Sequence, residues 1–217
     1  MASRQKHGSP KRPGGRSARV KAAVLQAALE ELADRGYAAL GFEGIARRSG
    51  VNRTTLYRRW GTLENLLLDA VLERGLERVP IPDTGSLGSD LLAYGKAIAA
   101  DVQAPEIQAI VRAVVFAGDG ESPLAEVRQR FWRARLELAG EIVKRAVGRG
   151  EIPPDTDPVV VVEALIAPIY FRLLMTGETL DRRFVEDVAE LVAAGARRTP
   201  SASRPARAAR TAKPAPR

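Results

Sequence analysis

Cysteine is absent from this 217-residue sequence, which excludes a disulfide framework, a cysteine-ligated zinc site and thiol chemistry. Histidine is nearly absent as well, since the only one, His7, lies in a segment of Pro, Gly and basic residues. No Gly-rich phosphate-binding loop is present either. With so few nucleophiles and ligands, we expect no enzyme activity, no cofactor and no metal site.

Two pairs of acids are the remaining candidates for a carboxylate mechanism: Asp119 with Glu121, and Asp155 with Asp157. Both pairs lie in segments that read as helix-capping turns, where acids favour the exposed N-terminal amides. We therefore interpret them as caps.

Long apolar runs are also missing, because no run approaches the ~20 residues that a membrane-spanning helix needs. The basic N-terminus has no apolar core after it, so we expect no secretory signal. An apolar content of 45% is enough for a packed core. We expect a soluble, cytoplasmic protein without a membrane partner.

Acidic residues are scarce at both ends of the chain. Residues 1–60 hold 13 Lys/Arg against 4 Asp/Glu, residues 61–198 hold 16 against 22, and residues 199–217 hold 5 against none. A basic head on an acidic body suits a protein that meets a polyanion at one end.

The two ends are expected to be disordered. Residues 1–16 show no helical periodicity, and residues 199–217 are mostly Ala, Pro and Arg. The N-terminal segment is interpreted either as a solvated tail or as an arm that enters the minor groove of DNA.

Three helices are predicted at the start of the ordered chain, over residues 17–35, 43–49 and 53–59. Gly50 supplies a left-handed stop for the second helix, and Asn52 supplies a side-chain cap for the third. The first helix is predicted to bury Leu25 and Leu29 against three side chains of the two shorter helices: Ile45, Leu56 and Trp60. Arg19 and Lys21 at its start are candidates for phosphate contacts.

The third helix turns hydrogen-bonding side chains outward while Leu56 and Trp60 form its inward stripe. A rod of this size fits the major groove, and a helix-turn-helix places the start of its second helix on base edges. The predicted DNA-binding residues are Arg47, Asn52, Arg53, Thr54, Thr55, Tyr57, Arg58 and Arg59.

Six further helices are predicted over residues 62–79, 89–102, 105–117, 123–148, from 158 onward and 181–197, which gives an all-α fold of about nine helices. Thr62, Ser122 and Asp157 read as N-caps. The segment VVVVEALIAPIYFRLLM is apolar nearly all round, so it must be buried from two sides, and a second subunit is a candidate for one of them. Pro168 within it predicts a kink unless neighbours compensate.

The stretches AALEELADRGYAAL, GIARRSGVNRTTLYRRW and ENLLLDAV resemble, in order and without a gap, the DNA-binding domain of the tetracycline-repressor (TetR) family of transcriptional regulators. The resemblance implies a phosphate contact for Tyr57. Two positions depart from the family pattern. Gly41 stands where a capping Thr is usual, and Leu63 stands where a phosphate-binding Lys is usual, so that lysine contact is not expected here.

The stretches RGEIPPDTDP and IAPIYFRLLMTGETLDRRFVEDV are similar to the ligand-binding and dimerisation domain of one TetR subgroup. This resemblance implies a homodimer in which the last two helices of each subunit form a four-helix bundle. It also implies an effector pocket, for which the candidates are Tyr94, Val111, Val115, Trp132 and Tyr170. The same residues are equally interpreted as core and interface residues.

The resulting prediction has four parts: a basic arm (1–16), a helix-turn-helix domain (17–61), a helical effector-binding and dimerisation domain (62–198) and a basic tail (199–217). The expected function is a homodimeric repressor that a small-molecule effector releases from a palindromic operator in double-stranded DNA. The alternative is an architectural protein that coats DNA through its basic tails with little sequence preference. Neither the effector nor the operator sequence follows from the residues.

Overall fold

The computed structural model describes residues 15–115 and 123–197, and every regular element in these two ranges is helical. The elements are α1 (Gly15–Arg35), η1 (Tyr37–Ala39), α2 (Phe42–Ser49), α3 (Arg53–Trp60), α4 (Leu63–Arg78), α5 (Leu87–Val102), α6 (Pro105–Val115), α7 (Pro123–Gly148), α8 (Pro158–Phe171), η2 (Arg172–Thr176) and α9 (Arg182–Arg197). The predicted all-α class is confirmed. The two tails and the turn that holds Asp119, Glu121 and Ser122 lie outside the described residues.

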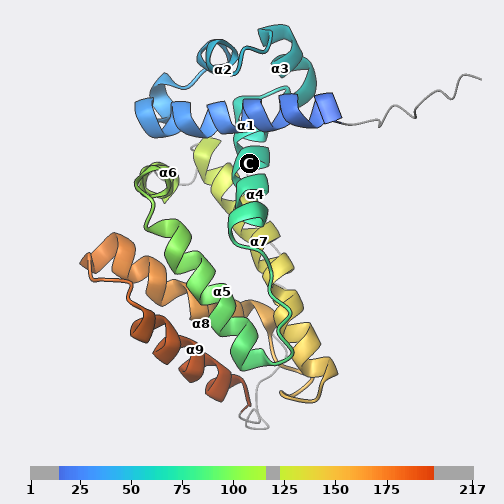
Figure 1. Ribbon diagram of the computed structural model, residues 1–217, viewed down its shortest axis with the longest axis vertical. Coiled ribbons are helices and arrows are strands. Elements are labelled where there is room, and N and C mark those ends of the chain that lie inside the picture. The colour runs from blue at the N-terminus through green and yellow to red at the C-terminus, as the bar shows by residue number, and fades with distance from the viewer. Residues whose placement is uncertain (1–14, 116–122, 198–217) are drawn as a thin grey trace, which may run out of the picture.

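Two groups of helices are joined by helix α4 (Figure 1). Helix α1 lies across one end of the molecule with α2 and α3 on its outer side, and we call these three helices the head. Helix α4 runs from the head toward the body and packs along α7. Helices α5, α7, α8 and α9 form the body, with α6 between the body and α1. Any movement of α4 therefore moves the head.

The head is held by one buried stripe of α1. Leu25 and Leu29 are buried at the 3.6-residue spacing that puts them on one face, and they share a core with Ile45, Leu56 and Trp60. The predicted packing is therefore confirmed. This core continues into the rest of the chain, since it also contains side chains of α4, α6 and α7.

A buried carboxylate fixes α2 on α1. Glu31 is only 2% exposed, and it accepts hydrogen bonds from Arg35 at 3.2 Å and from Arg48 at 3.1 Å. Gly44 is the residue of α2 that faces this carboxylate, and a Cβ atom there would overlap it. Gly44 is therefore a site of close approach between α1 and α2.

The predicted start of α5 is wrong by two residues. The helix begins at Leu87, because Ser86 caps it by accepting a hydrogen bond from the amide of Ser89. The glycines on either side of Ser86 made this segment read as part of the preceding loop. Two further cap predictions on described residues, Thr62 and Asp157, are confirmed.

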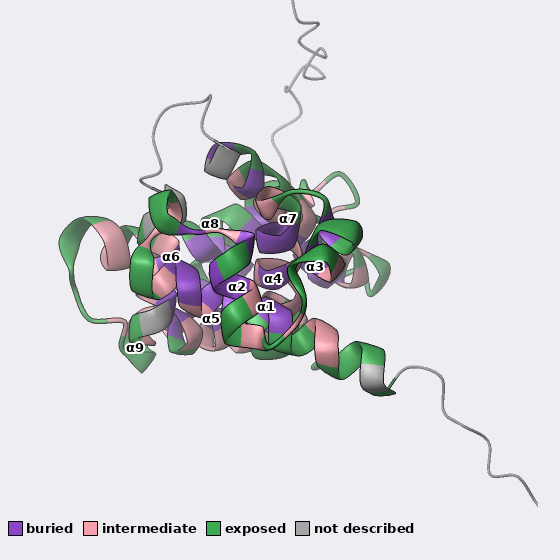
Figure 2. Cartoon of the chain, turned by 90° about the horizontal axis from the view of Figure 1, so that it is seen from above, coloured by how far each residue is buried: buried purple, intermediate pink, exposed green. Residues whose placement is uncertain are grey.

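The body has its own core, centred on Leu91 of α5, Ile142 of α7 and Leu165 and Ile169 of α8, all of which are fully buried. Seen from above, buried residues run through the middle of the helix stack, while exposed residues ring the outside (Figure 2). The body is thus a group of helices whose core lies against one side of α8.

Helix α8 keeps one apolar stripe uncovered. Val160, Ala164, Ala167 and Phe171 are exposed at helical spacing, although Leu165 on the opposite side is fully buried. By length and composition alone, Pro158–Thr176 could cross a membrane, but its buried side is part of the body core. Within the described residues of one subunit, this helix is therefore covered on one side only.

Pro168 does not end α8. The helix runs on to Phe171 and then widens into the π turn η2, which the amide of Gly177 closes by donating to the carbonyl of Arg172 at 2.8 Å. On α9, Leu191 is 74% exposed and does not share the buried face of Val185, Val188 and Val192.

Candidate nucleic-acid interface and effector cavity

The turn between α2 and α3 has the geometry of a helix-turn-helix. Gly50 adopts the left-handed conformation at φ 70°, where a side chain would be strained. Asn52 then accepts a hydrogen bond from the amide of Thr54 at 2.8 Å, which satisfies one of the free donors at the start of α3. Gly50 therefore ends α2 and Asn52 starts α3, so these two residues define the turn between the helices.

The outer face of α3 is cationic and rich in hydrogen-bond donors. The exposed side chains are Arg53, Thr54, Tyr57, Arg58 and Arg59, and Thr55 is half-buried. None of these arginines pairs with a carboxylate in residues 15–115 or 123–197. Their charges are therefore available to an external polyanion.

Aromatic rings hold part of this face in place. The ring of Tyr57 lies 4.3 Å from that of Phe42, measured between centroids, and the residue as a whole is 48% exposed. The guanidinium of Arg53 lies 5.7 Å from the Tyr57 ring, and that of Arg59 lies 5.1 Å from the Trp60 ring. The ring of Tyr57 is thus oriented by its contacts with Phe42 and Arg53.

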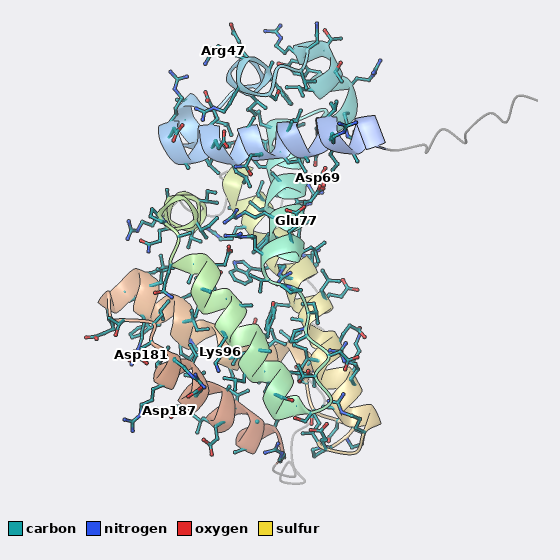
Figure 3. The ribbon with its side chains drawn as sticks, in the orientation of Figure 1. Arg47, Asp69, Glu77, Lys96, Asp181 and Asp187 are labelled. Atoms are coloured by element: carbon teal, nitrogen blue, oxygen red, sulfur yellow. The ribbon has the colours of Figure 1, made fainter. Side chains whose placement is uncertain are left out.

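The two adjacent arginines of α2 have different surroundings. Arg48 pairs with Glu31 at 3.1 Å and with Asp34 at 2.8 Å, and the hydrogen bond to Asp34 is the main cause that raises its pKa. Arg47 is exposed and approaches Glu31 only to 4.0 Å. It lies at the outer surface of the head, away from the body (Figure 3). Arg47 is the freer cation of the two.

Polar contacts fasten the end of α3 to α4. The indole nitrogen of Trp60 donates to Asp69 at 3.0 Å, and the side-chain amide of Asn65 donates to the carbonyl of Trp60 at 3.1 Å. Asn65 in turn accepts a hydrogen bond from Arg130 of α7 at 3.0 Å. The last turn of α3 is thereby connected to the body through a single side chain of α4.

Lys21 of α1 completes this junction. Its ammonium group pairs with Asp69 at 3.0 Å and with Glu73, and the hydrogen bond to Glu73 is the main cause that raises its pKa. Asp69 lies where α4 passes beneath α1 (Figure 3). The charge of Lys21 is therefore paired between α1 and α4, which disfavours a phosphate contact, and that contact stays a prediction. Arg19 remains exposed.

A cavity of about 100 Å³ lies where the head meets the body. Its walls come from α1, α4, α5, α6, α7 and α8. The lining residues are Leu29, Val71, Arg74, Gly75, Asp101, Val102, Ile107, Ile110, Val111, Val127, Phe131, Trp132 and Tyr170. The cavity is mainly apolar, and Leu29 belongs to the same buried stripe of α1 that supports α3.

The wall formed by α4 carries charge at its body end. Arg74 pairs with Asp101 of α5 at 3.2 Å, and Arg78 approaches the same carboxylate to 3.6 Å. The buried guanidinium of Arg135 from α7 donates to the carbonyl of Val79 at 3.0 Å and to the hydroxyl of Tyr94 at 2.9 Å. These contacts hold the C-terminal end of α4 in the body.

Two family models match consecutive parts of the chain. Residues 24–70 match the model described as "Bacterial regulatory proteins, tetR family", and residues 81–192 match "Tetracyclin repressor-like, C-terminal domain". The chain is 36% identical over 181 residues to the HTH-type transcriptional regulator AqdR of Rhodococcus erythropolis, covering 83% of this chain and 86% of that protein. The chain belongs to the TetR family.

Other TetR-family relatives span a similar length. An uncharacterised HTH-type regulator of Bacillus subtilis, YdeS, is 29% identical over 167 residues, covering 76% of this chain and 84% of that protein. The crystal structure of the TetR-family regulator SCO0332 superimposes with a TM-score of 0.67 at 35% identity, covering 82% of this chain and 98% of that one. This protein is therefore a TetR-family DNA-binding transcriptional regulator.

The cavity between the head and the body is lined by some of the predicted pocket residues and not by others. Val111, Trp132 and Tyr170 line it. Tyr94 does not, because it is 3% exposed and its hydroxyl faces Arg135. The side chain of Val115 lies outside the described part of the structure.

Sequence reasoning missed the polar lining pair Arg74 and Asp101, and also the junction residues Asn65 and Asp69. These side chains pair across long stretches of sequence, and no local pattern signals such pairs. The only available hint for Asn65 was its position beside the predicted Thr62 cap, where it reads as an ordinary first-turn residue.

Substitutions of Lys21 and of its neighbour Arg19 should affect stability differently, because only Lys21 forms ion pairs between α1 and α4. Lys21→Met leaves Asp69 and Glu73 close together without their cation, so we expect the free energy of unfolding to fall by about 1 kcal/mol. For a chain of this size that lowers Tm by about 2–4 °C. The matched change Arg19→Met, at an exposed position of the same helix, should leave Tm unchanged. Equal Tm values for the two variants in thermal unfolding would contradict the assignment.

Proposed function

We propose that this TetR-family regulator is a homodimeric repressor that binds a palindromic operator and is released by a small-molecule effector. Residues 17–61 serve as the DNA-binding domain and residues 62–198 as the effector-binding and dimerisation domain. The observation that carries the proposal is that one cavity is lined by Leu29 of α1 and Val71 of α4 as well as by the body. A ligand there touches the supports of the recognition helix.

The DNA-contacting surface is assigned to α3 and to Arg47. Arg53, Thr54 and Thr55 face base edges or nearby backbone, because the first turn of a recognition helix enters the groove most deeply. Arg58 supplies a base or phosphate contact. Arg47, Asn52 and Arg59 lie at the rim, where backbone contacts set the register.

The phosphate contact assigned to Tyr57 is supported by its position on α3, since its ring is packed on Phe42 while the residue as a whole is 48% exposed. Tyr57→Phe keeps the ring and removes only the donor. We expect it to weaken binding to every sequence by about threefold to tenfold, the value of one hydrogen bond. Thr55→Ala should instead change which bases are preferred.

Selection of bound duplexes from random DNA, followed by titration of the selected operator and of random DNA, measures both effects. If Tyr57→Phe left the affinity for all duplexes intact, the phosphate assignment would be wrong. If the unchanged protein bound selected and random duplexes equally, the architectural alternative would replace the repressor.

Dimerisation is assigned to the uncovered stripe of α8 together with α9. The stripe Val160, Ala164, Ala167, Phe171 places small residues between two large apolar ones, and Leu191 is exposed on the neighbouring helix. Small side chains let helices approach closely. A two-fold pairing of the α8 and α9 helices buries both faces at once, and two-fold symmetry is the commonest in homo-oligomers.

The double substitution Phe171→Glu and Leu191→Glu places two charges on each side of this interface, so we expect a monomer at micromolar concentration in sedimentation velocity. The matched control Leu76→Glu alters a similarly exposed leucine on α4, outside α8 and α9, and should stay dimeric. A monomeric unchanged protein, or a dimeric double variant that is still folded, would refute the assignment.

The release mechanism uses α4 as the connection between the two sites. Its first turns hold Trp60 through Asn65 and Asp69, and its later turns contribute Val71, Arg74 and Gly75 to the cavity. An effector that prefers a different tilt of α4 changes the spacing of the two recognition helices. It can shift operator binding only by its differential affinity for the two forms, typically about 1–3 kcal/mol, and operator DNA must weaken effector binding by the same factor.

A further inference from the structure

We infer that the effector is a small aromatic molecule with an oxygen hydrogen-bond acceptor and no positive charge. The inference rests on the proposed function, in that it takes the cavity between α1, α4 and α7 to be the effector site. It goes further by naming the chemical class that the walls of this cavity select. Three properties of the described lining support it: its rings, its unpaired donors and its charge.

Three rings form one wall. The ring centroids of Phe131 and Trp132 lie 5.2 Å apart with planes at 71°, and those of Trp132 and Tyr170 lie 5.3 Å apart with planes at 83°. These are edge-to-face contacts, and the same geometry favours insertion of a further ring. The lining also contains aliphatic side chains, with Ile107 and Ile110 of α6 among them. A flat ring suits a cavity with this lining.

Two hydrogen-bond donors on this wall lack partners. Neither the hydroxyl of Tyr170 nor the indole nitrogen of Trp132 makes a hydrogen bond within residues 15–115 and 123–197. Burial raises the pKa of Tyr170, which keeps its hydroxyl protonated and able to donate. A ligand that supplies an acceptor oxygen can therefore accept a hydrogen bond from one of these free donors while its ring packs on the aromatic wall.

The charges around the cavity disfavour a cation. The only carboxylate in the described lining, Asp101, is already shared by Arg74 and Arg78. The buried guanidinium of Arg135 lies beside Gly75 of the lining, and its hydrogen bonds go to carbonyl and hydroxyl oxygens instead of a carboxylate. A cationic ligand would enter a site with an excess of positive charge.

The size of the cavity sets the scale of the ligand. At about 100 Å³ it is comparable with an engineered apolar cavity of about 150 Å³ that binds benzene. A ligand of about one ring therefore matches its scale. A larger effector of the same class must push Leu29 or Val71 outward, and both belong to the helices that carry α3.

Four probes of nearly equal size test the class by titration calorimetry on the full-length protein. Acetophenone has the ring and the acceptor. Cyclohexyl methyl ketone lacks the aromatic ring, ethylbenzene lacks the acceptor, and 1-phenylethylammonium carries a positive charge. We expect acetophenone to bind at least about tenfold more tightly than each of the other three.

A pair of tyrosine variants tests the site. Tyr170→Phe should weaken acetophenone by about threefold to tenfold and leave ethylbenzene unchanged, since only the acceptor uses the hydroxyl. The matched change Tyr94→Phe removes a hydroxyl that faces Arg135 outside the lining, and it should leave the affinity for both probes unchanged. Thermal unfolding of each variant checks that it is folded.

The outcomes separate the inferred class from the proposed function. Equal or tighter binding of the saturated ketone or of the ammonium probe would overturn the class, as would no binding of acetophenone at 10 mM, a concentration on the order of weak fragment binding. If acetophenone bound with the expected selectivity but left the affinity for the selected operator unchanged, the class would stand and the release mechanism would fail. Release by a compound of another class would retain the mechanism and overturn the class.

Discussion

Helix α4 is the constraint on which the rest of the structure depends, because it is anchored at both ends by contacts that bury polar groups. At its head end, the indole of Trp60 donates to Asp69, and Lys21 neutralises the same carboxylate. At its body end, Arg135 donates to the carbonyls of Gly75 and Val79. A helix held in this way transmits displacement instead of absorbing it, since bending it would leave buried donors and acceptors unpaired.

Salt bridges between α1 and α2 use most of the acidic charge of the head. Three of the four acids in residues 1–60 lie on α1, where Glu30, Glu31 and Asp34 all contact Arg48 of α2. These carboxylates hold α1 and α2 together. The arginines of α3 pair with no carboxylate in the described residues, so their charge is available for the DNA contact that we propose.

Much of the fold could be predicted because it is encoded locally. The stripe with Leu25 and Leu29, the left-handed Gly50 and the cap Asn52 each follow from a spacing or a residue type. The cavity was harder, because its lining comes from six helices and its charged pair joins residues 27 positions apart. Tyr94 illustrates the limit: its pattern fits a pocket or a core equally well, and its contact with Arg135 places it in the core.

The central claim, that the body sets the position of the recognition helices through α4, is tested most directly by a distance between them. Because the chain has no cysteine, Arg58→Cys places one spin label on α3 of each subunit. Electron paramagnetic resonance should give a narrow distance distribution compatible with major grooves one DNA turn apart, ~34–36 Å. Saturation with acetophenone should shift that distribution. A distribution that stays the same while calorimetry shows the ligand bound would contradict the account.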